Sequence, residues 1–575
     1  MIIVIHKNRV KTIITRIFQT RVFPTFVSFT GAILVTYYLF DFPFSLNTSF
    51  VWETDGLLAQ AQIQSIIDSG IFGSTNNLGY PFGFTQWNNP EISYIHAVII
   101  WLLAKFFSIT TYGFITLIAF TSVFLNSLFM YVLASRIVKN RYFNYLFLLF
   151  GLLIPYSLYS LGHPHVITIY VYIALIILLI KIDLVSRKSI VLLLIVLLST
   201  NMFQLITITF IASILIIVYL INYLIFRDNL NLLKNLLKIY FSILSIFLLN
   251  VFNYVFHSPI NGQNGRNAYQ SDIFAGKLTD LILSSPFLSN FIPNLVDLQS
   301  GVSGEIRQVG LPLIISIFFG LFFILVYPSL QIKDNGIKVL TSLFTITTLT
   351  FITGGFGNLQ ASLFVIMGEV SPMRSWSRLS ILLGLISLVL LVVFLTERFG
   401  PKITNLFTSL IFFLAILDFT QIPRDSKFEP NFSAIEEAGF IEYIDSKIDP
   451  CPVLQLPVDT YFLPQSSVDR AWRFYWNGMI PYVVLPEFSW TAATYVDSLG
   501  WDSLASLPTE IDQKTINILK LKYCAIVFDK NFSQYQIDRN AGLEFTPGLW
   551  PGLRISNSVI SNFEDARYSV YLIND

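Results

Sequence analysis

Two acidic side chains near the start of the chain could do acid–base chemistry. Glu53 and Asp55 lie in the segment Trp52-Glu53-Thr54-Asp55-Gly56, and the apolar residues after it have a helical period: Leu57, Leu58, Ala61, Ile63, Ile66 and Ile67. This pattern predicts a helix with Asp55 at its N-terminus. A carboxylate held rigidly at a helix terminus could accept a proton from a hydroxyl group. An Asp in that position could equally cap the helix by accepting backbone N–H bonds, so both roles stay open.

A second group of residues has the composition of a sugar-binding surface. The stretch Gly79–Pro90 combines aromatic residues, glycines and amides, among them Tyr80, Trp87 and Asn88. Aromatic rings pack against the C–H face of a sugar while amides bond its hydroxyl groups. The alternative is that these rings belong to the aromatic belt at a membrane–water interface.

The overall composition indicates which elements must position these residues. Of the 575 residues, 12% are charged and 54% hydrophobic, whereas ordinary globular chains have about 25% charged residues. Most of the chain therefore cannot face water. A net charge of +1 excludes a typical nucleic-acid binder. Two cysteines, and five histidines without HExxH spacing, exclude a disulfide-stapled scaffold, a four-cysteine zinc site and a zincin.

Charge divides the chain into two parts. Residues 420–575 hold 12 basic and 20 acidic residues, a net charge of −8, and residues 1–419 hold 24 basic and 15 acidic residues, a net charge of +9. We expect a polytopic α-helical membrane region over 1–419 and a soluble α/β domain over 420–575.

Eleven apolar runs approach the length that crosses about 30 Å of hydrocarbon. The stretch from Ile190 to Phe226 is too long for one helix, and Ser199, Thr200 and Asn201 mark the expected turn. The predicted spans are Val27–Phe40, Phe114–Ala134, Phe143–Leu161, Val166–Ile180, Ile190–Asn201, Gln204–Phe226, Ile239–Phe256, Leu311–Tyr327, Val339–Thr353, Leu379–Leu395 and Ile403–Phe419.

The basic residues orient these spans. With the N-terminus in the cytoplasm, 18 of the 24 Lys and Arg residues before position 420 fall on the inner side and six on the outer side, as the positive-inside rule requires. The outer loops are then 41–112, 257–310 and 354–377, and 420–575 is extracytoplasmic. The first span is expected to be retained as an anchor. The run Ile92–Phe107 and the helix after Asp55 are expected to lie along the outer membrane surface.

This layout resembles the integral-membrane glycosyltransferases of the GT-C superfamily. Three fragments add to the resemblance: Gly162-His163-Pro164-His165, Gly304-Glu305-Ile306-Arg307-Gln308-Val309-Gly310 and Ser371-Pro372-Met373-Arg374-Ser375-Trp376-Ser377-Arg378. The superfamily's first-loop acid is often part of an adjacent pair, whereas Thr54 separates Glu53 from Asp55 here.

The resemblance implies transfer of a sugar from a polyprenyl-phosphate donor to a glycan, lipid or protein acceptor on the outer face of the cell membrane. Asp55, with Glu53 behind it, would be the base. Arg374 and Arg378, four residues apart, would bind the departing phosphate, assisted by Arg307 and Arg266, because guanidinium groups match phosphate geometry. Arginines at a membrane edge can instead reach toward lipid headgroups.

Further candidates carry alternatives of their own. His163, His165 and Glu305 are candidate substrate-binding residues, although the histidines could be hydrogen-bonding loop residues and Glu305 could pair with Arg307. No metal site and no cofactor are assigned, and the need for a divalent metal stays open. The expected enzyme is a hexosyl- or pentosyltransferase acting with inversion. The alternatives are a lipid-linked oligosaccharide flippase or other transporter, and a polysaccharide polymerase.

The C-terminal part is predicted to be an accessory domain of alternating helices and strands. Helices are expected at Ser433–Lys447 and Glu510–Lys522, and strands at Pro452–Pro457, Tyr482–Leu485, Tyr523–Asp529 and Ser569–Ile573. Cys451 and Cys524 border two of these strands. They could pair in an oxidising compartment, but we expect two separate buried thiols.

Overall fold

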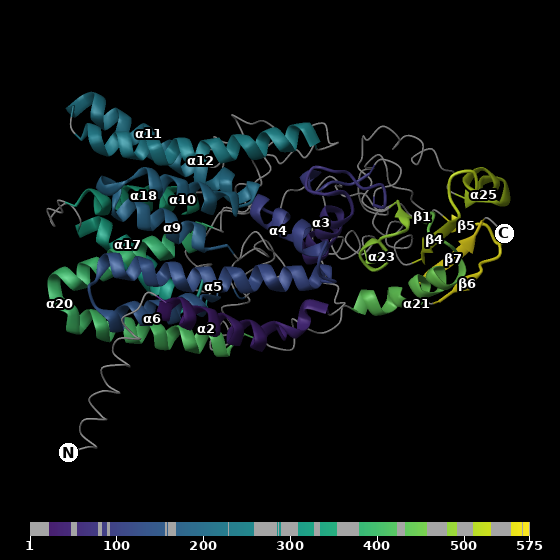
Figure 1. The fold of residues 1–575 in the computed structure, drawn as a ribbon, viewed down its shortest axis with the longest axis horizontal. Coiled ribbons are helices and arrows are strands. Elements are labelled where there is room, and N and C mark those ends of the chain that lie inside the picture. Colours follow the sequence, from purple (N-terminus) through teal and green to yellow (C-terminus); the bar gives the residue numbers. More distant parts are fainter. Residues whose placement is uncertain are drawn as a thin grey trace, which may run out of the picture.

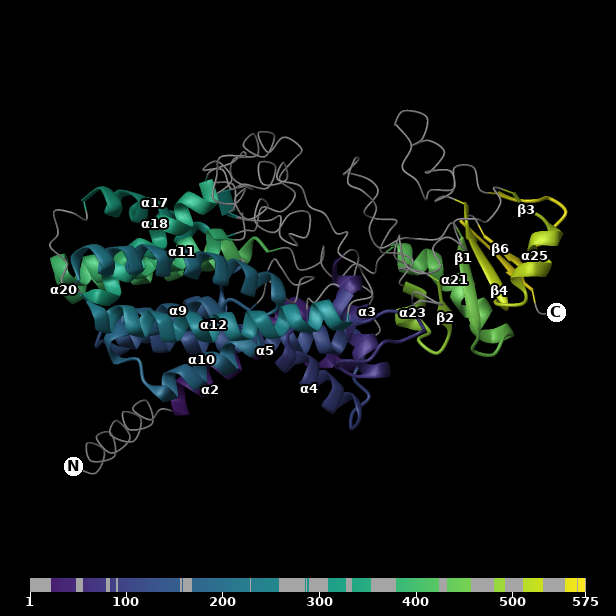
Figure 2. The same cartoon turned by 90° about the horizontal axis from the view of Figure 1, so that it is seen from above.

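The computed structural model confirms a polytopic α-helical protein with a small C-terminal sheet domain. The membrane helices form one end of the molecule and the sheet domain the other, with α3 and α4 between them (Figures 1 and 2). The structure describes residues 22–47, 55–78, 83–88, 92–155, 158, 168–227, 229–257, 285, 287–288, 309–326, 334–352, 379–422, 432–456, 480–491, 510–530, 554–565 and 567–573.

Each of the eleven apolar runs contains a helix. Within the described residues, five helices are long and apolar enough to cross a membrane. The expected turn at Ser199–Asn201 is confirmed, because Asn201 caps the following helix with its side chain. The helices are α2 (Val22–Phe40), α5 (Thr111–Ile137), α6 (Arg141–Leu152), α9 (Tyr170–Ile180), α10 (Arg187–Leu198), α11 (Met202–Phe226), α12 (Leu230–His257), α17 (Leu311–Val326), α18 (Asn335–Ile352) and α20 (Ser380–Thr420).

The last of these, α20, accounts for the final two runs because it folds back on itself. Gly400 has φ 77°, a conformation that glycine adopts without a steric penalty, and Pro401 follows it. Both ends of α20 then reach the start of α17: Gly384 packs against Leu313, and the Asp418 carboxylate accepts the Leu311 N–H. The two predicted spans are therefore the two arms of a helical hairpin.

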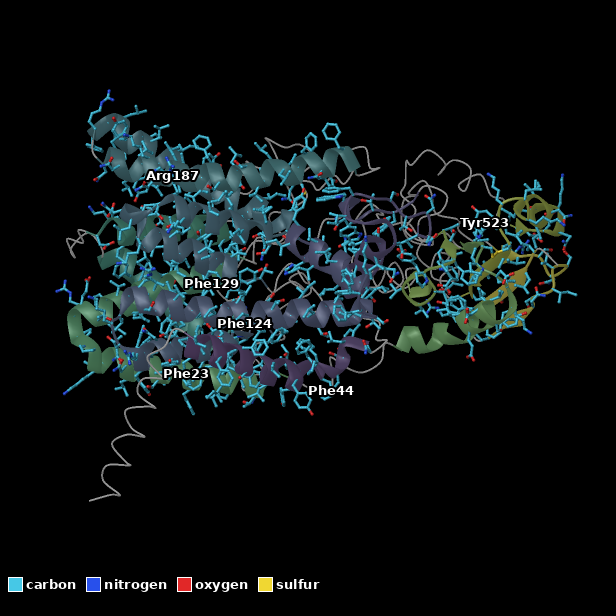
Figure 3. The ribbon with its side chains drawn as sticks, in the orientation of Figure 1. Phe23, Phe44, Phe124, Phe129, Arg187 and Tyr523 are labelled. Atoms are coloured by element: carbon cyan, nitrogen blue, oxygen red, sulfur yellow. A yellow bond between two sulfur atoms is a disulfide. The ribbon has the colours of Figure 1, made fainter. Side chains whose placement is uncertain are left out.

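Contacts between inter-helix segments show which helix ends lie together. Asn235 of α12 donates to the Ile182 carbonyl (2.9 Å), Asn335 of α18 donates to Asp183 (3.1 Å), and Asn140 donates to Asn405 (3.1 Å). Asn140, Ile182, Asp183, Asn235 and Asn335 belong to the predicted inner side, and Asn405 lies at the start of the predicted span Ile403–Phe419, next to that side. Arg187 and Phe23 accordingly lie toward the end of the bundle away from the sheet domain, whereas Phe44 lies nearer to that domain (Figure 3).

The C-terminal domain is built on a five-stranded mixed sheet of order β2-β1-β4-β7-β6. Strand β4 is central, parallel to β1 and antiparallel to β7, and helix α21 (Phe432–Lys447) packs against β7 and β6. The strands are β1 (Pro452–Leu456), β2 (Ser489–Trp490), β4 (Ala525–Asp529), β6 (Phe563–Glu564) and β7 (Tyr568–Leu572); a two-stranded sheet pairs β3 (Glu510–Ile511) with β5 (Arg554–Ile555).

Sequence predictions for this domain hold for its long elements and fail for its short ones. Strands β1, β4 and β7 lie where they are expected. The strand expected at Tyr482–Leu485 is wrong, because residues Ile480–Val484 form the short helix α23. The expected helix Glu510–Lys522 shortens to α25 (Gln513–Leu519), since Glu510 and Ile511 form β3 and Asp512 caps the helix by accepting the Thr515 N–H.

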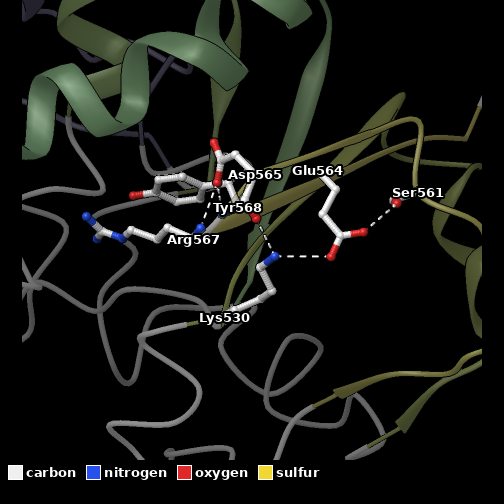
Figure 4. Close-up of polar contacts among 6 residues, drawn as sticks. All are labelled: Lys530, Ser561, Glu564, Asp565, Arg567 and Tyr568. Carbon is white, nitrogen blue, oxygen red and sulfur yellow. Dashed lines mark hydrogen bonds and ion pairs between the residues drawn. The ribbon is translucent and has the colours of Figure 1, made fainter.

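A charged network closes the β6–β7 turn. The Arg567 guanidinium bonds the Asp529 carboxylate through Nε (3.0 Å) and Nη2 (2.8 Å), and both side chains are largely buried. Lys530 pairs with Glu564 and donates to the Asp565 carbonyl, while the Asp565 carboxylate accepts the Arg567 N–H (Figure 4). These contacts fix the end of β4 against the hairpin that follows it.

The expectation of two separate thiols is wrong. Cys451 and Cys524 form a disulfide across the adjacent strand starts of β1 and β4, with Cα atoms 6.3 Å apart. The sequence did not reveal this pairing because proximity comes from the parallel register, in which Val453 lies opposite Ala525.

We expect the disulfide to stabilise the C-terminal domain. It links residues 73 positions apart, and a closed loop of that order contributes about 2 to 4 kcal/mol to the free energy of unfolding. The Cys451→Ser variant should therefore show a lower midpoint of denaturant unfolding for this domain. In the double variant Cys451→Ser, Cys524→Ser, the free energy of unfolding should fall by no more than in the single variant. An unchanged midpoint in both variants would contradict a stabilising role.

Candidate active site

Asp55 is the first residue of helix α3 (Asp55–Ser69), as the sequence predicts. The residues directly after it are fully buried: Leu57, Leu58 and Ala61 share one hydrophobic cluster with Ile444, Val453 and Trp490 of the C-terminal domain. The expectation that this helix lies on the membrane is therefore wrong, because protein covers the face that was assigned to lipid.

The opposite face of α3 packs on the membrane region. Ala59, Ile63 and Ile66 form a cluster with residues of α4 and of the first turns of α5. The Thr111 hydroxyl of α5 donates to the Gln60 side-chain oxygen at 3.2 Å, and both residues are buried. The start of α3 is thus packed between the first turns of α5 and the C-terminal sheet.

Two further contacts tie the C-terminal domain to the segment between α2 and α5. The Tyr482 hydroxyl donates to the Asp68 carboxylate at 2.8 Å. Burial, followed by the charge of Asp68, raises the pKa of Tyr482 well above its usual range, so the phenol stays protonated and keeps donating. Leu78 forms a parallel bridge with Trp490, and the backbone N–H of Trp490 donates to the Asn77 carbonyl (2.9 Å). The residues around Leu78 thereby extend the edge of the sheet at β2.

The interpretation of Trp87 as a sugar platform requires correction. Its ring is 2% exposed, its indole N–H donates to the Ile71 carbonyl at 3.0 Å, and it stacks on Phe72. A ring enclosed in this way has no free face for a sugar. Trp87 instead belongs to the 3-10 helix η2 (Gln86–Asn88), which packs against α3 and α12. Asn253 of α12 also donates to the Tyr94 hydroxyl.

Helix α4 (Tyr94–Ala104) corresponds to the run that was expected to lie along the surface. Val98, Ile99 and Leu102 expose apolar surface on one side, and the Lys105 ammonium lies over the Trp101 ring. The buried His96 on the other side is neutral, since burial lowers its pKa to about 4. The helix therefore has the features of an interfacial element.

The remaining candidates cannot be compared with the structure. The backbone of Asn88 is described, but its side chain and that of Asp55 are not. Glu53, Tyr80, His163, His165, Arg266, Glu305, Arg307, Arg374 and Arg378 lie outside the described residues.

Sequence reasoning missed two kinds of residue that shape this region. Asp68 and Tyr482 join the domains and carry no signal in the sequence, because they are 414 positions apart. Asp418 has a signal that was overlooked: it is an acid inside an apolar run, and such residues are expensive to bury and usually have a role.

A metal ion finds no ready ligand set among the residues described. In that part of the chain, no three His, Cys, Asp or Glu side chains gather closely enough to hold one.

Comparisons with known proteins give a likeness in architecture. No protein-family model matches the chain, and neither does any curated protein. Among solved structures, the chain is similar to the oligosaccharyltransferase of Archaeoglobus fulgidus crystallised with zinc and sulfate, with a TM-score of 0.45 and 12% identity over 89% of this chain and 68% of that one. A second structure of the archaeal enzyme, AglB, in complex with an inhibitory peptide and dolichol-phosphate, has a TM-score of 0.44 and 12% identity over 89% of this chain and 70% of that one.

A bacterial protein is similar over nearly its full length. ArnT from Cupriavidus metallidurans bound to undecaprenyl phosphate has a TM-score of 0.39 and 14% identity over 95% of this chain and 97% of that one. The resemblance drawn from the sequence is thus met again among solved structures. At these TM-scores and sequence identities, the likeness does not indicate what this chain binds.

Proposed function

We propose that the chain is a GT-C-type membrane glycosyltransferase that moves a sugar from a polyprenyl-phosphate donor to an acceptor on the outer face of the membrane. The observation that carries the proposal is the placement of Asp55. It begins a helix whose next residues are buried on both sides, between the C-terminal domain and the outer end of α5. A carboxylate needs this rigidity to act as a base.

The proposed reaction is a single displacement at the anomeric carbon. The Asp55 carboxylate takes the proton of the acceptor hydroxyl. At the same time, the oxygen of that hydroxyl forms a bond to the anomeric carbon. The bond between the anomeric carbon and the phosphate oxygen breaks, and the lipid phosphate leaves with the electron pair. The configuration inverts, for a hexosyl or a pentosyl group alike. Glu53 lies two residues before Asp55 and is the alternative base.

The departing phosphate needs cations. Arg374 and Arg378 are assigned to it, with Arg307 and Arg266 as further contributors, because charge-assisted and bidentate hydrogen bonds to phosphate oxygens stabilise the charge that develops. Tyr80, Asn88, His163, His165 and Glu305 remain proposed substrate contacts.

The proposed reaction takes place outside the cytoplasm. The disulfide between Cys451 and Cys524 supports an oxidising compartment for residues 420–575. The C-terminal domain packs on the loop 41–112, so both must lie on the same side of the membrane. Positive-inside counting of the sequence favours the extracytoplasmic side for both.

Thiol labelling tests this arrangement. Both native cysteines are in the disulfide, so a single new cysteine is the only free thiol. Ser74 and Ser558 are exposed in the outer loop and in the C-terminal domain. In intact spheroplasts, Ser74→Cys and Ser558→Cys should react with an impermeant maleimide, whereas Ser186→Cys, exposed at the predicted inner side, should react only after lysis. Protection of Ser74→Cys or Ser558→Cys before lysis would refute the topology.

Proteoliposomes separate transfer from transport. Presented with a labelled polyprenyl-phosphate sugar and an acceptor, a transferase yields glycosylated acceptor and free lipid phosphate. A flippase would move the intact donor between leaflets without cleaving it. If the intact donor equilibrates between the leaflets and is not cleaved with glycan, lipid or peptide acceptors, transport is favoured over our proposal.

A further inference from the structure

A buried carboxylate outside the proposed chemistry stands out in the membrane region. Asp418 lies near the outer end of α20 and is 0% exposed. A lone acid in an apolar helix is costly to bury unless its oxygens accept hydrogen bonds. Asp418 therefore calls for a role that offsets this cost.

Among the residues that the structure describes, the donors to the Asp418 carboxylate come from the segment that leads into α17. Its Oδ1 accepts the Ser285 hydroxyl (2.7 Å) and the Phe287 N–H (3.2 Å), and its Oδ2 accepts the Leu311 N–H (2.5 Å). Ser285 Oγ in turn accepts the Leu288 N–H at 3.1 Å. One side chain thus holds both the middle of the outer loop 257–310 and the point where the chain enters α17.

The backbone next to Leu311, whose N–H bonds the Asp418 carboxylate, has little conformational freedom. Gly310 has φ +92°, and a Cβ atom built there would lie 2.7 Å from Pro155 and 3.1 Å from Asp418 Oδ2. The residue must therefore be glycine for the chain to pass this close to the carboxylate. Arg307 is three residues before Gly310 in the sequence, so the anchored residues Gly310 and Leu311 are its close neighbours along the chain.

We propose that Asp418 is a positioning residue, whose carboxylate ties the loop 257–310 to α20 and thereby places Arg307 for the donor phosphate. The inference rests on the proposed function for the role of Arg307, but the anchoring itself does not. The Asp418 side chain suits this task because its two carboxyl oxygens accept three donors, whereas an amide offers only one acceptor oxygen.

The substitution Asp418→Asn tests the anchoring without using activity. The amide replaces one acceptor by a donor, so the N–H of Phe287 or of Leu311 must lose its partner. In the full-length protein in lipid nanodiscs, hydrogen exchange at Phe287, Leu288 or Leu311 should accelerate about tenfold or more, the worth of one hydrogen bond to a charged group. The control Thr408→Val removes a buried hydrogen bond from the same helix and should leave these amides unchanged.

Ser285→Ala gives a milder variant in case Asp418→Asn does not fold. It removes one donor and the acceptor for Leu288, so exchange should accelerate at Phe287 and Leu288 but not at Leu311. Unchanged exchange in both variants would overturn the anchoring, whatever the protein catalyses.

Donor binding tests the functional half of the inference. Binding of a polyprenyl phosphate should weaken about 2- to 30-fold in Asp418→Asn, the range for residues that act on a site through their neighbours, and donor KM should rise more than kcat falls. Unchanged binding in Asp418→Asn, where Arg307→Ala weakens it, would overturn the positioning role. Absence of donor binding in the wild type would instead refute the proposed function, and hydrogen exchange would still decide the anchoring.

Discussion

The Asp55→Asn variant is expected to lose about 10² to 10⁴ in turnover, the usual contribution of a general base. The amide has nearly the shape of the carboxylate but cannot take a proton from the acceptor hydroxyl. Donor binding and the unfolding midpoint should change little, because Asn caps helices about as well as Asp. The measurement is kcat with saturating donor and acceptor, alongside donor affinity.

The same substitution at a pure cap is the matched control. Asp512 caps α25 by accepting the Thr515 N–H at 2.8 Å and lies in the C-terminal domain. Asp512→Asn should leave turnover unchanged. If Asp55→Asn is as silent as Asp512→Asn, Asp55 is a cap only, and Glu53→Gln becomes the substitution to measure.

Arg374→Ala should weaken binding of the donor by about 10- to 150-fold. This corresponds to about 1.5 to 3 kcal/mol for the loss of a hydrogen bond to a charged group. Arg374→Lys should recover part of the affinity, because an ammonium keeps the charge but not the fork of the guanidinium. The measurement is the dissociation constant for a polyprenyl phosphate in nanodiscs.

An arginine that is paired on the surface controls for loss of charge. Arg554 is exposed and pairs with Glu510 in the C-terminal domain, so Arg554→Ala should bind the donor like the wild type. Wild-type affinity in a folded Arg374→Ala protein would remove Arg374 from the phosphate site and leave Arg378 and Arg307 as the candidates.

The helices of the membrane region could be predicted from the sequence because each of them depends mainly on residues that are close together along the chain. A helix in hydrocarbon must satisfy its own backbone, so each apolar run forms a helix and the polar turn at Ser199–Asn201 separates two of them. The hairpin in α20 was visible for the same reason, since Gly400 and Pro401 interrupt the apolar pattern.

Contacts between distant segments could not be predicted. The period of Leu57, Leu58 and Ala61 indicates a buried face, but the sequence cannot say whether lipid or the C-terminal sheet covers it. The disulfide and the Asp68–Tyr482 hydrogen bond depend on how strands and domains pack. Burial of Trp87 likewise follows from its packing on Phe72, since its residue type suits a binding surface and a core equally.

The most direct test of the proposed activity is release of lipid phosphate by the purified full-length protein in lipid. A panel of polyprenyl-phosphate sugars would be offered with glycan, lipid and peptide acceptors, and free polyprenyl phosphate and glycosylated acceptor would be counted together. We expect one donor to give both products in equal amounts, and Asp55→Asn to form them about 10² to 10⁴ times more slowly. No acceptor-dependent release from any donor, or equal release by wild type and Asp55→Asn, would contradict the account.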